Sequence, residues 1–290
     1  MKLLNPEHIA RLLIRCPDGP GIVAAVTTFL KNHGVNITDL QQHSTDPMGG
    51  KFFMRLEFQS VHLDVSKAKL EESFQLEVAQ VFNMDYEFHY VLPYKRMALL
   101  VSLHDHCLLE ILWRWSRKEL ALTIPFIISN HAALEEFAKN FKVPFYHIPV
   151  DKTNKDQAEQ AVLDLCRDKV DGLILARYMQ ILSKPFVSQY VNKIINIHHS
   201  FLPAFVGANP YQQAYDKGVK LIGATAHYVT EDLDMGPIIA QDVVPVSHRD
   251  SPFTLKELGR NVERNVLAKA LSYHLDDKII VDGNKTVVFD

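Results

Sequence analysis

Residues 193–203 read Lys-Ile-Ile-Asn-Ile-His-His-Ser-Phe-Leu-Pro, an apolar strand that runs directly into an amide and two imidazoles. Side chains alternate along a strand, so Asn196 and His198 point one way while Ile195 and Ile197 point into packing. Open α/β sheets place their ligands at the carboxyl ends of parallel strands. This stretch therefore predicts a polar pair at the mouth of a site, although Asn and His are also common as strand-end caps.

Strand and helix patterns alternate on both sides of this stretch. The predicted strands are Met97–Leu103, Thr123–Ser129, Phe145–Ile148, Gly172–Ala176, Lys193–Ile197, Ile222–Val229 and Ile238–Val244. The predicted helices lie near Asp105–Lys118, Ala132–Asn140, Lys155–Asp168, Lys184–Tyr190, Pro210–Lys217 and Pro252–His274. Such alternation is typical of a Rossmann-like, doubly wound α/β fold with a mostly parallel sheet.

The first 92 residues follow a different order. The predicted strands are Ile9–Cys16, Val35–Thr45, Lys51–Phe58 and Tyr86–Leu92, with helices over Ile22–His33 and from Ser66 to about Phe82. The second helix should bury Leu70, Phe74, Val78, Val81 and Phe82. The order βαββαβ predicts a ferredoxin-like sandwich. We therefore expect one domain over residues 1–92, a linker over 93–96 and a second domain over 97–290, which ends in a hairpin over 279–289.

Composition excludes several function classes. The formal charge is −3, so there is no basic surplus to neutralise a nucleic acid backbone. Apolar runs such as Ile22–Val26 are about five residues long, whereas a bilayer span needs about 20. The N-terminus has no apolar leader segment. Three scattered cysteines, Cys16, Cys107 and Cys166, favour reduced thiols and a cytoplasmic location.

A second polar stretch runs Asp232-Leu233-Asp234-Met235-Gly236-Pro237 between two predicted strands. Taken alone it is a tight turn capped by Asp. His227 precedes it on a strand and adds another polar group. Together, amide, imidazole and carboxylate can hydrolyse or transfer an acyl group without metal: the amide and a protonated imidazole hold an oxyanion, and the carboxylate orients the imidazole and accepts a proton.

Three other chemistries fit the sequence less well. His104-x-His106 and His198-His199 could bind a metal, but paired ligand motifs such as HExxH or CxxC are missing. Cys107 begins a predicted helix, where a thiolate is favoured, but a buried apolar role is the commoner one. Dinucleotide binding is disfavoured because no G-x-G-x-x-G follows the first strand of the second domain.

The stretches NIHHSFLPAF, GATAHYVTEDLDMGPIIAQ and ARYMQILS resemble the catalytic domain of the folate-dependent formyltransferases, over about residues 95–275. The resemblance implies that Asn196, His198 and Asp234 are the catalytic trio. It also implies that a pterin pocket is lined by Tyr178, Met179, Gln180, Ile181, Leu182 and the loop containing Asp232. His199, His227 and His248 are candidate supporting groups around the site.

Residues 15–22 (RCPDGPGI) and 34–37 (GVNI) resemble an ACT domain, a regulatory module that often binds amino acids. An ACT domain followed by a formyltransferase domain is similar to the formyltetrahydrofolate deformylases, whose acceptor is water. The resemblance implies glycine or methionine as effector. In the loop before Ile22, backbone N–H groups near Asp18, Gly19 and Gly21 could hold a carboxylate, and Asn36 is a further candidate.

The residues themselves also favour water as acceptor. A ribonucleotide acceptor needs a phosphate cradle after the first strand, where the chain reads Ser102-Leu103-His104-Asp105-His106-Cys107 without glycine. The expected reaction is hydrolysis of 10-formyltetrahydrofolate to formate and tetrahydrofolate, which supplies formate for purine synthesis. The folate is the substrate, and no cofactor or metal is expected.

Two alternatives remain open from the sequence: formyl transfer to an unidentified small acceptor, and a non-enzymatic folate or amino-acid sensor. A sensor has no need of all three residues Asn196, His198 and Asp234. Because ACT modules commonly pair, the resemblance also implies a homo-oligomer, without nucleic-acid or membrane partners.

Overall fold

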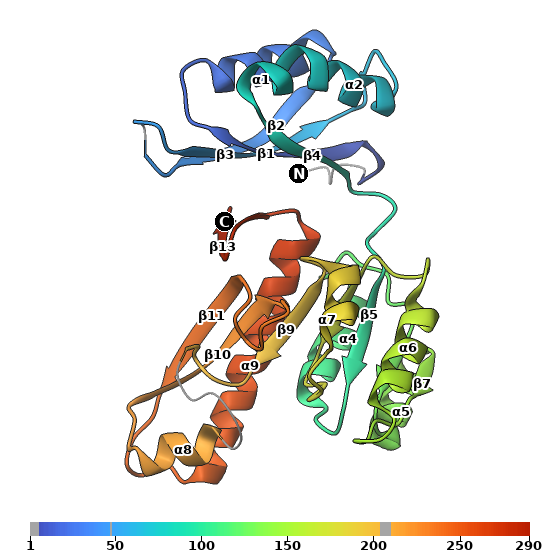
Figure 1. The fold of residues 1–290 in the computed structure, drawn as a ribbon, viewed down its shortest axis with the longest axis vertical. Coiled ribbons are helices and arrows are strands. Elements are labelled where there is room, and N and C mark those ends of the chain that lie inside the picture. Colours follow the sequence, from blue (N-terminus) through green and yellow to red (C-terminus); the bar gives the residue numbers. More distant parts are fainter. Residues whose placement is uncertain (1–5, 47, 204–209) are drawn as a thin grey trace. The chain divides into compact units, whose positions relative to one another are not determined.

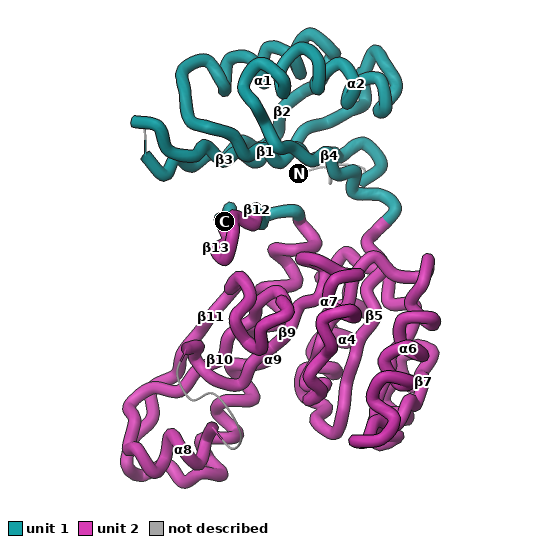
Figure 2. Tube along the Cα trace, viewed as in Figure 1, with its two compact units in different colours: residues 1–93, 277–280, 287–290 teal, residues 94–276, 281–286 magenta. Residues whose placement is uncertain are grey.

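The computed structural model describes residues 6–46, 48–203 and 210–290 (Figure 1). The chain divides into two compact units, shown in different colours in Figure 2. The first contains residues 1–93, 277–280 and 287–290, and the second contains residues 94–276 and 281–286. The C-terminal residues 277–280 and 287–290, which the sequence placed in the second domain, therefore pack in the first unit.

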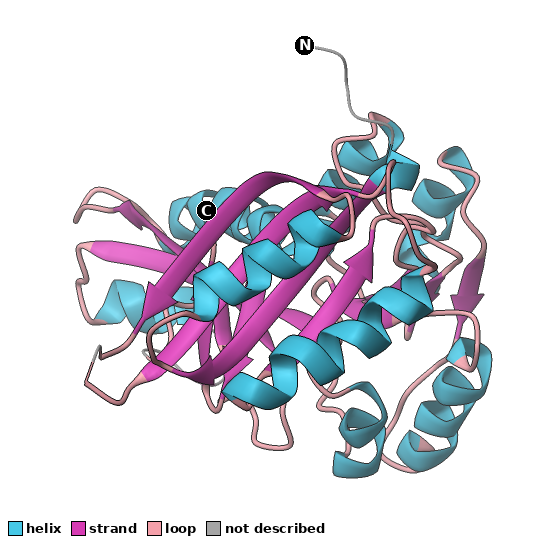
Figure 3. Ribbon diagram, turned by 90° about the horizontal axis from the view of Figure 1, so that it is seen from above, coloured by secondary structure: helices cyan, strands magenta, loops and turns pink. Residues whose placement is uncertain are grey.

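The first unit is a four-stranded antiparallel sheet in the order β2-β3-β1-β4. Its strands are β1 (Ile9–Pro17), β2 (Asn36–Ser44), β3 (Lys51–Gln59) and β4 (Asp85–Tyr90), preceded by the 3₁₀ turn η1 (Pro6–His8). The helices are α1 (Ile22–Asn32) and a second one made of α2 (Lys67–Phe74), the π-helical η2 (Gln75–Ala79) and α3 (Gln80–Phe82). The helices cover one face of the sheet (Figures 1 and 3), so the predicted βαββαβ sandwich is confirmed.

Both faces of this sheet are covered, which explains why β1 reads as apolar without alternation. Leu12 and Ile14 belong to the core beneath the helices, whereas Leu13 on the opposite face packs with Ile280 and Phe289 from the C-terminus. The opposite face also carries charge: Arg11 Nη1 lies 3.1 Å from Asp277 Oδ2, and both side chains are buried. The C-terminal residues thus replace solvent on the second face of the sheet.

One predicted core residue of the first unit is misplaced. Val81 is 69% exposed, although Leu70, Phe74 and Val78 on the same predicted face are buried. The π-helical turn over Gln75–Ala79 takes more residues per turn than an α-helix, so positions after it rotate away from the expected face.

The second unit is built on a seven-stranded sheet in the order β11-β10-β9-β8-β5-β6-β7. Its strands are β5 (Met97–Val101), β6 (Ile127–Ser129), β7 (Phe145–His147), β8 (Gly172–Leu175), β9 (Ile194–His198), β10 (Leu221–Tyr228) and β11 (Ile238–Pro245). Its helices are α4 (His106–Ser116), η3 (Ala132–Leu134), α5 (Glu135–Asn140), α6 (Lys155–Cys166), α7 (Lys184–Val187), η4 (Ser188–Tyr190), α8 (Pro210–Asp216) and α9 (Pro252–Leu275). A hairpin of β12 (Ile279–Asp282) and β13 (Lys285–Val288) ends the chain, as predicted.

Five strands of this sheet, from β9 to β7, are parallel, while β10 runs antiparallel to both β9 and β11. The mostly parallel sheet is therefore confirmed. The chain builds β5, β6 and β7 toward one edge and then returns to add β8 and β9 on the other side of β5. The carboxyl ends of β5 and β8 thus form the switch point where open α/β sheets bind ligands. Among the described residues, no helix is long and apolar enough to cross a membrane.

Candidate active site

The predicted catalytic trio comes together at the carboxyl end of β9. Asn196 and His198 lie on β9, and Asp234 lies in the loop between β10 and β11. His198 Nδ1 is 3.2 Å from Asp234 Oδ2. Asp234 has a positive φ of 55°, an uncommon conformation for a residue with a side chain, and this sharp turn brings its carboxylate back over the strand end.

His227 completes a four-residue cluster, because β10 pairs antiparallel with β9 and sets His227 opposite Asn196. His227 Nε2 lies 3.2 Å from Asn196 Nδ2 and 3.6 Å from Asp234 Oδ1. Its Nδ1 lies 2.9 Å from the Tyr228 carbonyl oxygen, which can only accept, so Nδ1 carries a proton. In neutral His227 the Nε2 atom is then an acceptor, and it orients the Asn196 amide by accepting one of its N–H groups.

Asp234 is ionised in this environment. Burial by itself raises the pKa of the carboxyl group, but the hydrogen bond that it accepts from His198 Nδ1 holds the pKa well below its usual range. Because Asp234 is an acceptor only, it fixes His198 with its proton on Nδ1. His198 Nε2 is buried and has no hydrogen-bond partner among the described residues.

A cavity of about 340 Å³ opens beside the trio. Its walls include every residue predicted for the substrate pocket except Asp232; they are Tyr178, Met179, Gln180, Ile181, Leu182, His199 and His227. Met179, Ile181 and Leu233 are each more than half exposed and form an apolar rim. The volume and the lining suit a flat heteroaromatic ligand with a reactive group near the trio.

The segment 177–183 shapes one wall of the cavity through its backbone. Arg177 and Met179 both have positive φ, 66° and 59°, so the chain turns twice within three residues. The far end of the segment is held by Glu159 on α6, whose carboxylate accepts hydrogen bonds from the Ser183 amide, at 2.9 Å, and from the Ser183 hydroxyl.

His199 follows the trio residue His198 and also lines the cavity. Burial, followed by the charge of Arg177, lowers the pKa of His199 to about 3. This imidazole is therefore neutral at physiological pH and can donate or accept a hydrogen bond without adding charge to the site.

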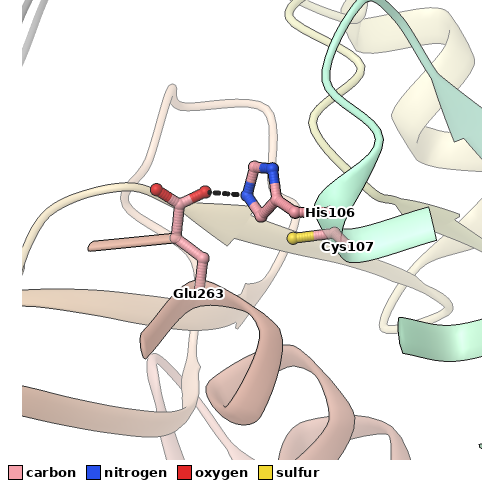
Figure 4. Close-up of side chains that lie close together, drawn as sticks. All are labelled: His106, Cys107 and Glu263. Atoms are coloured by element: carbon pink, nitrogen blue, oxygen red, sulfur yellow. Dashed lines mark hydrogen bonds and ion pairs between the residues drawn. The ribbon is translucent and has the colours of Figure 1, made fainter. Parts of the chain in front are cut away.

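Behind the cavity lies a polar cluster that sequence reasoning did not identify. Glu263 Oε2 lies 2.8 Å from His106 Nε2, and the Tyr211 hydroxyl donates to Glu263 Oε1 at 2.5 Å (Figure 4 shows the His106 contact). Arg177 Nη1 lies 3.5 Å from Glu263 Oε2. In the sequence, this cluster is indicated by Glu263, an acidic residue that lies between Val262 and Val266 on the buried side of α9.

Cys107 lies beside this cluster but has little reactivity. Its sulfur points toward Glu263 in Figure 4. Burial and the nearby Glu263 raise the pKa of the thiol well above its usual value, so the thiolate needed by a nucleophile does not form. The other sequence candidates, His104 and His248, lie outside the described cavity lining.

The predicted effector residues do not all meet within one chain. Gly21 has a φ of 91° and begins α1, and the Asp18 carboxylate accepts from the Ser44 hydroxyl at the end of β2. Asn36 stands at the opposite end of β2, roughly 26 Å away along the strand. Asp18, Gly19 and Gly21 share one loop, whereas Asn36 is remote from it.

Comparison with known proteins adds to this geometry. Residues 95–271 match the formyl transferase family and residues 10–72 match the ACT domain. A formyltetrahydrofolate deformylase of Bacillus subtilis is 49% identical over 285 residues, which cover 98% of this chain and 95% of the relative. The crystal structure of a formyltetrahydrofolate deformylase from Pseudomonas syringae is 46% identical, with a TM-score of 0.95, and the match covers 100% of this chain and 96% of that one.

The catalytic unit is also similar to a transferase. The structure of glycinamide ribonucleotide transformylase 1 from Symbiobacterium toebii is 28% identical, with a TM-score of 0.65. The match covers 70% of this chain and 97% of that one.

Proposed function

The chain belongs to the formyltetrahydrofolate deformylase family, and from this membership we propose how its own residues hydrolyse 10-formyltetrahydrofolate to formate and tetrahydrofolate. The observation that carries the function is the length of the match: the deformylase of Bacillus subtilis aligns with 98% of the chain, across both units. The transformylase match covers 70%. The protein is thus a hydrolase that cleaves an amide C–N bond.

The pterin of the substrate lies in the cavity against residues 178–182, and the apolar rim of Met179, Ile181 and Leu233 packs on its faces. Backbone groups of this segment form hydrogen bonds with the edges of the pterin ring, and neutral His199 is a further hydrogen-bond partner. Asp232 lies outside the described lining, so its role is to shape the loop that carries Asp234. The formyl group then reaches Asn196 and His198.

Hydrolysis proceeds through a tetrahedral intermediate. The water oxygen forms a bond to the formyl carbon, and the His198–Asp234 pair takes the water proton. A carboxylate with so low a pKa is a weak base on its own, so His198 shares this task. The bond from carbon to N10 then breaks as N10 takes this proton, and the product leaves as formate, with its remaining acid proton released to solvent.

Asn196 stabilises the negative oxygen of the intermediate. One Asn196 N–H is engaged by His227 Nε2, and the other N–H remains to donate to the oxyanion. This gives His227 a positioning role rather than direct contact with the reacting atoms. Imidazolium at His198 supplies the second donor after it has taken the water proton.

No metal or cofactor is required in this scheme, because the folate is the substrate and the polarising groups are side chains. The product formate suits a role in supplying purine synthesis and in balancing the one-carbon folate pool. We place this chemistry in the cytoplasm, where folates and reduced cysteines occur together.

The first unit binds an amino acid, glycine or methionine, at the loop of Asp18, Gly19 and Gly21. Backbone N–H groups at the start of α1, an eleven-residue helix, favour the ligand's carboxylate. Within one chain Asn36 is too far away to share this ligand. It could take part only from a second copy, which agrees with the homo-oligomer that ACT domains commonly form.

The decisive experiment is to incubate the protein with 10-formyltetrahydrofolate alone. We expect formate and tetrahydrofolate in equal amounts without any acceptor. Millimolar glycinamide ribonucleotide should leave formate release unchanged and should give no formylated product. Formyl transfer at a rate near that of hydrolysis would instead establish the transferase alternative.

A further inference from the structure

Four side chains meet at the switch point of the catalytic sheet: the buried His106, Arg177 and Glu263, and the partly buried Tyr211. They are called the switch-point cluster below. His106 begins α4 after β5, Arg177 follows β8, Tyr211 lies on α8 and Glu263 lies on α9. Segments from four parts of the chain therefore converge on the crevice between β5 and β8.

The cluster is centred on Glu263, whose side chain is 1% exposed. Both of its oxygens are engaged, Oε2 by His106 and Arg177 and Oε1 by Tyr211. The packing is close enough to depend on Gly259: a Cβ atom at that position would lie 2.0 Å from the Tyr211 hydroxyl oxygen. The cluster is thus held together by hydrogen bonds, by an ion pair and by the close packing of its side chains.

The position of the cluster relative to the cavity follows from the lining. Arg177 and His199 form part of the wall, whereas Glu263, Tyr211 and His106 lie behind them. The His199 ring is 6.3 Å from the Tyr211 ring and 5.2 Å from the His198 ring. The cluster therefore backs the trio on the side where open α/β sheets bind ligands.

Several polar atoms of the cluster are buried. His106 Nδ1, Arg177 Nε and Arg177 Nη1 are buried and have no hydrogen-bond partner among the described residues. Ligand atoms of His106, Cys107 and Glu263 lie within 4.8 Å of one another, which is compatible with a metal site. A divalent cation there would have to displace His106 from Glu263 and lie beside the Arg177 guanidinium, so a closed ion-pair network fits these residues better.

We propose that the switch-point cluster walls off the acceptor side of the active site, so that water is the only nucleophile that reaches the formyl carbon. The inference rests on the proposed deformylase function. It identifies Arg177 as a residue that determines acceptor specificity by the space it fills.

The test uses hydroxylamine, a small neutral nucleophile, together with 10-formyltetrahydrofolate. Its nitrogen would attack the formyl carbon, the bond to N10 would break, N10 would take the proton released by the attacking amine, and N-hydroxyformamide would form. Arg177→Ala removes the wall, and Arg177→Met keeps most of its volume without the charge. We expect the ratio of N-hydroxyformamide to formate to rise by about tenfold or more in Arg177→Ala and to stay close to the wild-type ratio in Arg177→Met.

A second pair of variants tests the proposal independently in case Arg177→Ala does not fold. Tyr211→Ala opens the cluster from α8, and Tyr211→Phe keeps the ring; the same contrast in product ratio is expected. The proposal is overturned if folded variants that release formate give no more N-hydroxyformamide than the wild type, or if the wild type already forms it as fast as formate. Absence of formate from the wild type would instead refute the deformylase function itself.

Discussion

The Asp234 carboxylate lies between two histidines. Its Oδ2 is 3.2 Å from His198 Nδ1, and its Oδ1 is 3.6 Å from His227 Nε2. An amide at this position cannot accept a proton or carry the charge that orients His198. We expect Asp234→Asn to nearly abolish kcat while folate binding, measured by equilibrium titration, stays within a few-fold of wild type. More than about a tenth of the wild-type kcat would show that the carboxylate is not part of the base.

Asn196 is assigned to the oxyanion rather than to substrate binding. Removal of one such donor usually costs about 10²–10³ in kcat, so Asn196→Ala should lose that much with KM little changed. The opposite pattern, an increase in KM with an unchanged kcat, would make Asn196 a binding residue. Steady-state formate release over a range of folate concentrations gives kcat and KM separately and decides between them.

Sequence reasoning reached some site residues more easily than others. Asn196 and His198 follow from strand alternation, because an amide and an imidazole on one face of an apolar strand end are conspicuous. Arg177 and Glu263 were missed as site residues: Arg177 lies within the recognised segment but was given no role there, and Glu263 is buried in a helix whose polar residues mostly face outward. Only the fold shows that side chains 86 positions apart form a pair.

The segment 177–183 is held at its far end by the carboxylate of Glu159. Glu159 accepts from both the amide and the hydroxyl of Ser183, which also caps α7. Loss of this anchor frees the cavity wall without touching the trio. We expect Glu159→Ala, which loses both hydrogen bonds to Ser183, to raise KM by about tenfold or more, with kcat within a factor of two or three. Glu135→Ala on α5, which loses only an exposed ion pair with Lys139, is the matched control and should change neither constant.

Helix α9 carries a charge whose effect on stability depends on pH. Burial opposes ionisation of Glu263, but His106, Arg177 and Tyr211 lower its pKa to about 2, from an ordinary 4.5. A lowered pKa stabilises the fold fully above pH 4.5, and this contribution is lost as pH falls toward 2. This lowering of the pKa of Glu263 is equivalent to about 3 kcal/mol in the free energy of unfolding.

The variant Glu263→Gln should therefore unfold more easily than the wild type at pH 7 and lose less stability on acidification. Urea unfolding between pH 6 and pH 3, followed by the fluorescence of Trp113 and Trp115 in the same unit, measures both effects. Parallel pH profiles for the two proteins would contradict the assignment.

At the level of elements, the sequence predicted the order of strands and helices because periodicity and turn residues are local signals. The π-helical turn over Gln75–Ala79 was not visible, since it changes the phase of a helix without changing its composition. The reversed direction of β10 was not visible either, because strand direction is decided by the connection and not by the residues of the strand.

For the whole molecule, the unexpected feature is the return of the C-terminus to the first unit. Asp277 is buried against Arg11, and its carbonyl oxygen accepts from Arg55 Nε at 3.1 Å. Arg11 keeps its ion pair with Glu57 when Asp277 is removed. Asp277→Ala should therefore destabilise the first unit by about 1.5–3 kcal/mol, the cost of losing a hydrogen bond to a charged group. Asp85→Ala breaks an exposed pair with Arg15 in the same unit and should cost less than about 1 kcal/mol. Hydrogen exchange at the amides of β1 and β3, read by mass spectrometry, compares the two; equal protection would contradict the prediction.

This discontinuous unit also has a consequence for biosynthesis. The ribosome completes the sheet of the first unit by residue 93, but the residues that cover its second face emerge only from 277 onward. At about 5–20 residues per second, the nascent sheet waits roughly 10–40 s with Leu13, Phe53, Arg11 and Arg55 uncovered. During that interval the young chain is a natural client for holding chaperones. Newly made protein should thus be more prone to aggregate than finished protein, and a stop codon near the end of the gene should be more harmful than its position suggests.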